Sequence, residues 1–234
     1  MTTHAILGPS GGDRWLTCAG SVALSANLPD KSNDAADEGT VFHLVGSTAL
    51  NMGMNAADFV GEEAVVYHSV ELDEDCCDFT TDFFKRGLDK LYKPRYQTKV
   101  DADNAQYLQV YIDYVRTVAH QNELLVEVSV PIDHLTDEKD ATGTADAVVI
   151  NRAQRELVAI DLKFGRGVEV IAENNVQMMM YALGVLEDLR KKGIDFSPEK
   201  VRLVIVQPRT GSGKPDEWVI EIAQLEEFAK RVKR

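Results

Sequence analysis

The sequence predicts an α/β (α+β) fold in which a central mixed β-sheet is flanked by helices and preceded by a helical N-terminal region. Three observations predict it. Helical periodicity dominates residues 1–120, strand-like apolar runs dominate residues 121–234, and one long helical segment interrupts those runs at 173–192. The second half therefore has the order β-β-β-α-β, within a single 234-residue domain.

The predicted sheet is built from short apolar segments bounded by turn residues. Strands are expected at 124–130, 143–150, 156–163 and 201–207, with a short fifth strand at 218–222 and a final helix at 225–234. The polar segment 151–155 has the length of a hairpin loop. The second and third strands are therefore expected to pair in antiparallel fashion.

The N-terminal part, residues 1–120, is predicted to be mainly helical. Helices are expected after Ser10, at 37–52, at 74–92 and at 104–120, whereas residues 56–75 are acidic and carry no clear pattern. Gly39 inside the second of these helices costs about 1 kcal/mol relative to alanine. We therefore expect another group to approach the helix closely at Gly39.

The composition indicates a globular protein. Apolar residues make up 44% of the chain and charged residues 27%, no apolar run is long enough to cross a bilayer, and the N-terminus lacks the features of a secretory signal. Cytoplasmic residence without membrane contact is expected. The net charge of −13 argues against a nucleic-acid partner at first sight. Carboxylates at a metal centre contribute to that charge, however, and bound cations reverse its local sign.

Two aspartates and a lysine interrupt the apolar strands. Asp161 and Lys163 are two residues apart and should project from the same face of their strand. Burying such charges is costly unless they are paired or bind a metal. In a hairpin around 151–155, paired residue numbers sum to about 306, which places Asp161 opposite residue 145 and beside Asp146. Two carboxylates and a lysine make a site for a hard cation, Mg²⁺ or Mn²⁺. The alternative is a buried ion pair.

Several segments in a fixed order resemble the PD-(D/E)XK nuclease superfamily, in its RecB-like branch. The segments are "GTADAVVI", "ELVAIDLKFGRG" and "NVQMMMYAL", preceded by "DKSNDAADEGTVFHLV". The N-terminal "PSGGDRWLTCAGSVAL" resembles the opening of phage and prophage RecB-like exonucleases. The resemblance spans residues 9 to 184 and implies a restriction-endonuclease-like core.

The resemblance implies a role for each residue that matches a motif. It implies metal ligation by His43, Asp146, Asp161 and the backbone carbonyl of Leu162. It implies a catalytic set of Asp146, Asp161, Lys163, Gln177 and Tyr181. In this set Lys163 is the catalytic lysine, and the last two residues orient the active site or contact the DNA backbone.

Five further residues are weaker candidates. Glu127 and Glu38 are acidic residues near the motifs, but the motifs do not fix their positions. Arg14 and Trp15 could clamp or stack on a nucleic-acid end, although a tryptophan that anchors a helix beside an exposed arginine fits equally well. Arg166 follows the predicted catalytic strand and could reach a phosphate.

The function expected from these features is that of a metal-dependent DNA nuclease. The resemblance implies a phage exonuclease that hydrolyses linear, double-stranded DNA in recombination or DNA processing, in the host cytoplasm, beside a single-strand annealing protein and as a homo-oligomer. The alternatives are an inactive DNA-binding module with the same fold and an acidic interaction protein. Related branches carry a cysteine quartet, whereas this chain has only Cys18, Cys76 and Cys77, so no iron–sulfur cluster is expected.

Overall fold

The computed structural model describes residues 5–26, 34–69 and 92–233. In chain order its elements are η1 (Pro9–Gly11), α1 (Gly12–Thr17), α2 (Gly20–Ser25), α3 (Asp34–Met52), η2 (Ala56–Phe59), β1 (Glu63–Ser69), β2 (Tyr92–Lys99), α4 (Ala102–Ala119), β3 (Glu123–Pro131), β4 (Thr142–Asn151), β5 (Glu156–Leu162), α5 (Val176–Lys191), β6 (Lys200–Val206), β7 (Asp216–Glu221) and α6 (Ile222–Val232).

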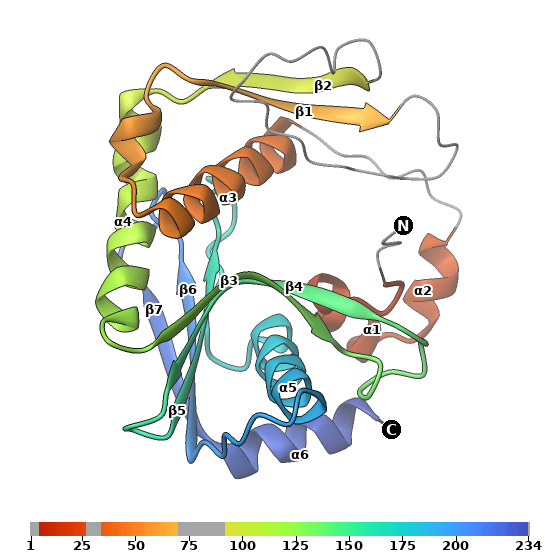
Figure 1. Ribbon diagram of the computed structural model, residues 1–234. Helices are drawn as coiled ribbons and strands as arrows, with labels where there is room; N and C mark the ends of the chain where they lie inside the picture. The colour runs from red at the N-terminus through yellow and green to blue at the C-terminus, as the bar shows by residue number, and fades with distance from the viewer. Residues whose placement is uncertain (1–4, 27–33, 70–91, 234) are drawn as a thin grey trace.

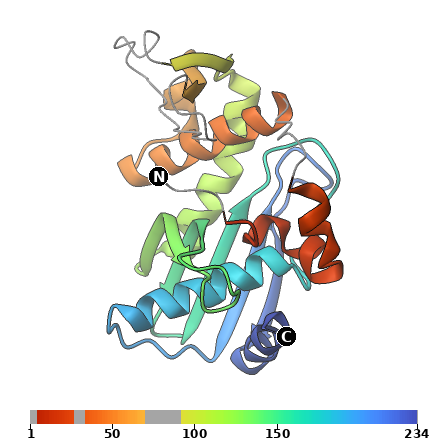
Figure 2. The same cartoon turned by 90° about the vertical axis from the view of Figure 1, so that its right-hand side faces the viewer.

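A five-stranded mixed sheet forms the centre of the fold, in the order β3-β4-β5-β6-β7. The only parallel pair among these strands is β5 with β6, and the long helix α5 connects the two. Helices α5 and α6 lie on one face of the sheet, and α3 and α4 lie on the other (Figures 1 and 2). The sequence prediction of an α+β protein with a mixed central sheet flanked by helices is therefore confirmed.

Two hydrophobic cores hold these layers together, one on each face of the sheet. The first lies between the sheet and α5 with α6, and the second lies between the sheet and α3 with α4. Strand β5 is buried along its whole length, as expected for a central strand whose two faces are both covered. Gly184 allows helix α5 to pack closely against β3. A Cβ atom added to this residue would lie only 2.8 Å from Val130 Cγ2.

The N-terminal part differs from the prediction of a mainly helical region. Strands β1 and β2 form a separate two-stranded antiparallel sheet above α3 (Figure 1). Strand β2 was missed because Pro94 and several cations give its sequence the character of a loop. The helix predicted at 74–92 lies outside the described residues except for Tyr92, which begins β2. Among the described residues, no atom outside the local helix lies within 4 Å of a Cβ added to Gly39, so they do not provide the close approach expected there.

Two helices begin a few residues away from their predicted starts, because the residues that cap them differ from those expected. Helix α5 begins at Val176 rather than at 173, because the Asn175 side chain accepts a hydrogen bond from the Met178 amide and acts as the N-cap. Helix α1 starts after Gly11, and Ser10 lies inside η1 instead of capping the helix. Within the described ranges, no helix combines the length and apolarity needed to cross a membrane.

Candidate active site and metal centre

The candidate site lies where β4 separates from β5. The two strands pair from Asn151↔Glu156 to Ala147↔Ile160 and no further. Continuing this register places Asp161 opposite Asp146, one residue from the partner predicted by sequence. Beyond the last backbone pair, the Leu162 amide bonds to a side chain instead of to the backbone of β4. Asp146 Oδ2 accepts this hydrogen bond at 2.7 Å.

This hydrogen bond also fixes where the carbonyl of Leu162 points. The N–H and C=O groups of one strand residue face the same neighbouring strand. The next amide along the chain, that of Lys163, donates in the opposite direction to Val206 on β6. The Leu162 carbonyl is therefore directed toward the gap occupied by the Asp146 carboxylate. The position suits the metal-ligand role that the resemblance implies for this carbonyl.

Successive side chains of a regular strand face opposite sides of the sheet, and β3 and β4 both depart from this alternation at neighbouring positions. On β3, Leu125 and Val128 both contact the core on the α5 side, although residues three apart in a regular strand face opposite sides. On β4, Ala145 and Val148 show the same break. Glu127 lies between the two β3 residues and has a φ of 50°, a left-handed conformation that is costly outside glycine. Such strain often accompanies functional sites.

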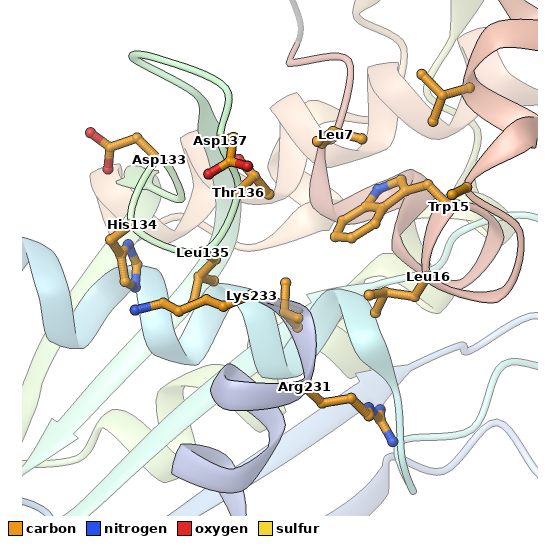
Figure 3. Close-up of a pocket in the computed structure, with 13 residues that line it drawn as sticks. Leu7, Trp15, Leu16, Asp133, His134, Leu135, Thr136, Asp137, Arg231 and Lys233 are labelled. Carbon is orange, nitrogen blue, oxygen red and sulfur yellow. The ribbon is translucent and has the colours of Figure 1, made fainter.

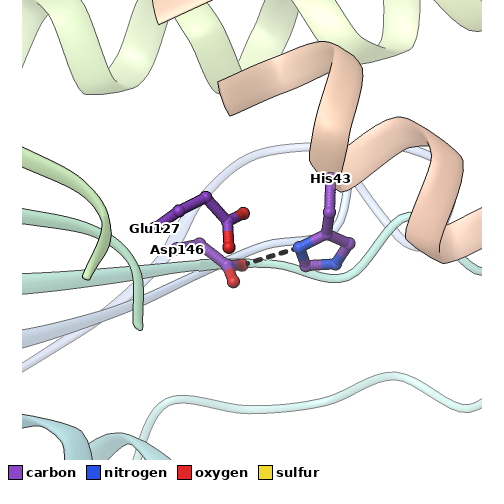
Figure 4. Close-up of side chains that lie close together, drawn as sticks. All are labelled: His43, Glu127 and Asp146. Atoms are coloured by element: carbon purple, nitrogen blue, oxygen red, sulfur yellow. Dashed lines mark ion pairs between the residues drawn. The ribbon is translucent and has the colours of Figure 1, made fainter. Parts of the chain in front are cut away.

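The break brings three side chains from three elements together. His43 on α3, Glu127 on β3 and Asp146 on β4 each offer a ligand atom, and these atoms lie within 4.8 Å of one another (Figure 4). His43 Nδ1 lies 3.2 Å from Asp146 Oδ2. Sequence reasoning ranked Glu127 low because the motif does not fix its position, whereas the structure places it beside two primary candidates.

A chain of polar contacts links β5 to α5 on the other side of this group. Lys163 Nζ lies 2.9 Å from Asp161 Oδ2 and donates to Gln177 Oε1 at 3.0 Å. Gln177 Nε2 in turn donates to Tyr181 Oη at 2.8 Å. The four residues therefore form one connected group, and α5 holds the lysine through two side chains one helical turn apart.

The carboxylate of Asp161 is buried beside a single ammonium group. The residue is only 2% exposed, and its Oδ2 atom lies 2.9 Å from Lys163 Nζ. Among the described residues, no further group donates a hydrogen bond to this atom. A bound cation would add positive charge beside a carboxylate that is costly to bury.

The charges of the site are unbalanced. Glu127 is exposed on one side, yet the partial desolvation of its carboxyl and then the neighbouring Asp146 carboxylate raise its pKa to about 7. Burial also raises the pKa of Asp161, against the opposing effect of the Lys163 ammonium. Burial would lower the pKa of His43, but the carboxylates of Asp146, Asp161 and Glu127 together outweigh it, with Asp146 contributing most, and raise that pKa to about 9. All of these shifts reduce the negative charge, as expected where carboxylates crowd together without a cation.

Aromatic and cationic residues hold α3 over the site. The rings of Phe42 and Phe164 stack with centroids 4.0 Å apart. Arg209 covers Phe164 at 4.7 Å and forms an ion pair of 2.8 Å with Glu38. Glu38, an outside candidate for the metal site, is therefore engaged by Arg209, and its role is to position the helix that carries His43. Arg209 lies in a polar turn and was not singled out by sequence.

The N-terminal candidates have structural partners. Arg14 donates to Ser25 Oγ at 2.5 Å, which ties α1 to α2. Trp15 is 7% exposed, belongs to the core next to α5, and its indole N–H donates to the Gly8 carbonyl at 3.0 Å. The structure thus favours the interpretation of Trp15 as an anchor over that of an exposed stacking platform.

Trp15 also lines a groove that is separate from the metal-ligand group. The groove has a volume of about 770 Å³ and lies between α1, the loop 133–137 and the end of α6 (Figure 3). Its lining includes none of His43, Glu127, Asp146 or Asp161. Of the remaining candidates, Arg166 is exposed in the loop after β5. Cys18 is exposed, and Cys76 and Cys77 lie outside the described residues.

Two comparisons with known proteins produced matches. A solved structure described as "Crystal structure of SSO0001" has 16% sequence identity and a TM-score of 0.27, over 55% of this chain and 59% of that one. This similarity is too low to carry an argument, and the matched part spans about three fifths of that protein. A family model described as "Protein of unknown function (DUF2800)" matches residues 4–234. The chain therefore belongs to the DUF2800 family.

Proposed function

We propose that this protein is a metal-dependent DNA nuclease of the PD-(D/E)XK type, in the RecB-like branch. The observation that carries the proposal is the arrangement of His43 on α3, Asp146 on β4, and Asp161 and Lys163 at the end of β5. Short contacts connect them: His43 pairs with Asp146, Asp146 accepts from the Leu162 amide, and Asp161 pairs with Lys163. These are the residues whose order in the sequence resembles the nuclease motifs.

The competing interpretation, a structural ion pair, accounts poorly for these charges. Three carboxylates, those of Glu127, Asp146 and Asp161, face one lysine and one histidine. An ion pair that served only stability would not leave such an excess of acid. A divalent cation would balance the excess, because carboxylate oxygens are the ligands that Mg²⁺ and Mn²⁺ prefer.

The donors present fit such a cation. Asp146, Asp161 and the Leu162 carbonyl offer oxygen, and His43 offers nitrogen, with Glu127 available as a further oxygen donor. The imidazole favours Mn²⁺ over Mg²⁺, since Mg²⁺ takes almost only oxygen ligands. When bound, the cation would lower the pKa of a water molecule and neutralise charge on the scissile phosphate.

Lys163 is suited to stabilising negative charge rather than to accepting a proton. Burial would lower its pKa, but the Asp161 carboxylate outweighs that effect and raises it, so the ammonium persists at neutral pH. In the proposed hydrolysis, the oxygen of water bonds to phosphorus, one water proton passes to solvent, and the bond to the leaving oxygen breaks as that oxygen takes up a proton. The ammonium stabilises the charge that develops on the phosphate.

Gln177 and Tyr181 keep the lysine in place. The Gln177 carbonyl oxygen accepts from Nζ, and its amide donates to the tyrosine hydroxyl, which fixes the orientation of the amide. Both residues are therefore positioning groups. The finer expectations, a phage exonuclease that acts on linear double-stranded DNA beside an annealing protein and within a homo-oligomer, are part of this proposal and rest on the resemblance.

The test compares linear and circular double-stranded DNA with Mg²⁺, Mn²⁺ or EDTA. We expect metal-dependent loss of DNA with the wild-type protein and none with Lys163→Ala. Lys192→Ala is the matched control, because this exposed lysine of the same half of the chain pairs only with Asp188 among the described residues. Loss of linear DNA alone would identify an exonuclease. Equal activity of the Lys163 and Lys192 variants, or no metal-dependent loss of DNA, would refute the proposal.

A further inference from the structure

The loop 163–175 connects β5 to α5, and both of its ends lie near the candidate catalytic lysine, Lys163. It leaves β5 at Lys163, and after the N-cap of α5 the chain returns to the same ammonium through Gln177 at 3.0 Å. Both ends of this loop therefore lie at the candidate catalytic lysine.

Side chains from the neighbouring strands clamp this loop. The buried amide of Gln207 donates to the Val168 carbonyl at 3.1 Å and accepts from the Val170 amide at 3.0 Å. Asp216 at the start of β7 accepts from the Ala172 amide at 2.6 Å. Gln207 follows the last residue of β6, which pairs with the last residue of β5, so the clamp sits at the same end of the sheet as Lys163.

The clamped loop presents apolar side chains to water. Val168 is 87% exposed and Ile171 is 58% exposed, and the exposed Arg166 lies between them and Lys163 in the chain. A single exposed apolar residue on a surface needs no explanation. Here, however, two of them project from a loop whose backbone is fixed by three hydrogen bonds to side chains, at the end of the sheet that carries the candidate catalytic group.

We propose that Val168 and Ile171 form a wedge that stacks against the terminal base pair of a DNA end and separates its strands. The inference rests on the proposed nuclease function and deepens it, because it names the side chains that would open a paired DNA end. Apolar side chains of this kind are known to insert between bases and unstack them. Arg166 would hold the adjacent phosphate, since arginine pairs well with phosphate oxygens.

The size of the surface favours a base over a protein partner. A stable protein interface needs a contiguous patch with many contributing residues, whereas the flanking positions 166, 167, 169, 173 and 174 are also exposed but polar or glycine. Two aliphatic side chains with a cation beside them match the apolar face of a base and its phosphate.

The test measures hydrolysis of two linear duplexes that differ only at their ends. One is blunt, and the other has three non-complementary terminal pairs, so its strands are already separated. The variant is the double substitution Val168→Ser and Ile171→Ser. The matched control is Val60→Ser and Val219→Ser, because both valines are exposed and lie outside this loop.

We expect the wedge variant to cut the blunt duplex at least about tenfold more slowly than wild type, and to cut the separated duplex at the wild-type rate. The control variant should match wild type on both. Equal rates of the wedge variant and wild type on the blunt duplex, or an equal loss on both duplexes, would overturn the wedge while leaving the nuclease proposal intact. Failure of wild type to cut either duplex would overturn the nuclease proposal itself.

A binding measurement provides a second readout that does not depend on turnover. A duplex with 2-aminopurine in its terminal pair becomes more fluorescent when that base is unstacked. The Lys163→Ala protein, which should not cut the duplex, is expected to raise the fluorescence, and the same protein with the two serine substitutions is expected not to. An equal rise with both proteins would refute the wedge.

Discussion

Strand β5 carries a buried carboxylate near each end, and the two carboxylates differ in the number of cationic side chains that contact them. Glu156 is 1% exposed and Asp161 is 2% exposed. Arg202 donates two hydrogen bonds, of 2.8 and 3.2 Å, to the Glu156 carboxylate, and Lys200 Nζ lies 3.7 Å from Glu156 Oε1. Asp161 has one lysine, and among the described residues no further group donates a hydrogen bond to its Oδ2 atom.

The charge balance separates the two ends further. Around Glu156, Arg202 also pairs with Glu217 at 3.2 Å, so two carboxylates face two cations. Around Asp161, three carboxylates face one lysine and a histidine. A balanced buried network is what a structural role requires, whereas an excess of carboxylates is what a cation site requires.

The largest expected difference concerns catalysis. Asp161→Asn should lower the Mn²⁺-dependent rate on linear DNA by about 10²–10³-fold, the size of effect seen when one stabilising group is lost from an active site. Glu156→Gln should retain most of the wild-type rate, because Glu156 lies at the opposite end of the strand. Initial rates measure both. Comparable losses in the two variants would contradict the distinction between the two ends.

The second difference concerns stability. Arg202→Met leaves Glu156 buried without its main partner and should lower the free energy of unfolding by about 3 kcal/mol. Lys163→Met in EDTA should cost less, because the raised pKa of Asp161 lets that carboxyl take up a proton instead. Urea denaturation measures both. Adding Glu156→Gln to Arg202→Met should restore part of the loss, and no restoration would contradict the proposed pairing.

The third difference concerns metal binding. Mn²⁺ at about 100 times its dissociation constant should stabilise the wild-type protein by about 2.7 kcal/mol. Thermal unfolding with Mn²⁺ and with EDTA measures the effect. Asp146→Asn should abolish it, and Glu156→Gln should preserve it. A stabilisation that survives Asp146→Asn would mean that the cation binds elsewhere.

The sequence predicted the elements of the site better than its geometry. Asp161 and Lys163 were recognisable because strand periodicity places residues two apart on one face. The hairpin estimate placed Asp161 opposite residue 145 to within one register step. The observed register points to Asp146 instead, because the strands close on the pair Asn151↔Glu156 with Arg155 in a left-handed conformation. Local turn geometry of this kind is not encoded in the spacing of apolar residues.

The contacts that complete the site are long-range, and no local pattern reveals them. The ion pair between Glu38 and Arg209 joins residues 171 positions apart and sets where α3 carries His43. The left-handed Glu127 is equally hidden, since a non-glycine residue in that conformation is held by its surroundings rather than by its own preference. The sequence therefore predicted that Asp146 and Asp161 lie close together, but not the break in side-chain alternation on β3 and β4 that brings Glu127 beside Asp146.

The smallest expected effect is a dependence of stability on pH that arises from Glu127. In the metal-free protein its pKa is raised from 4.5 to about 7, so the folded state holds a proton that the unfolded state has lost. The stability contributed by this group is present below pH 4.5 and is lost as the pH rises toward 7. Glu127→Gln should remove this decline in EDTA and make the protein more stable than wild type at pH 8. With Mn²⁺ the order of stability of the two proteins should reverse, because glutamine cannot offer the metal a charged oxygen.

Melting temperatures at pH 5 and pH 8 measure this pH dependence. Asp113→Asn on the exposed surface of α4 is the control. An unchanged pH dependence in Glu127→Gln would show that this glutamate does not belong to the crowded acidic end of the sheet.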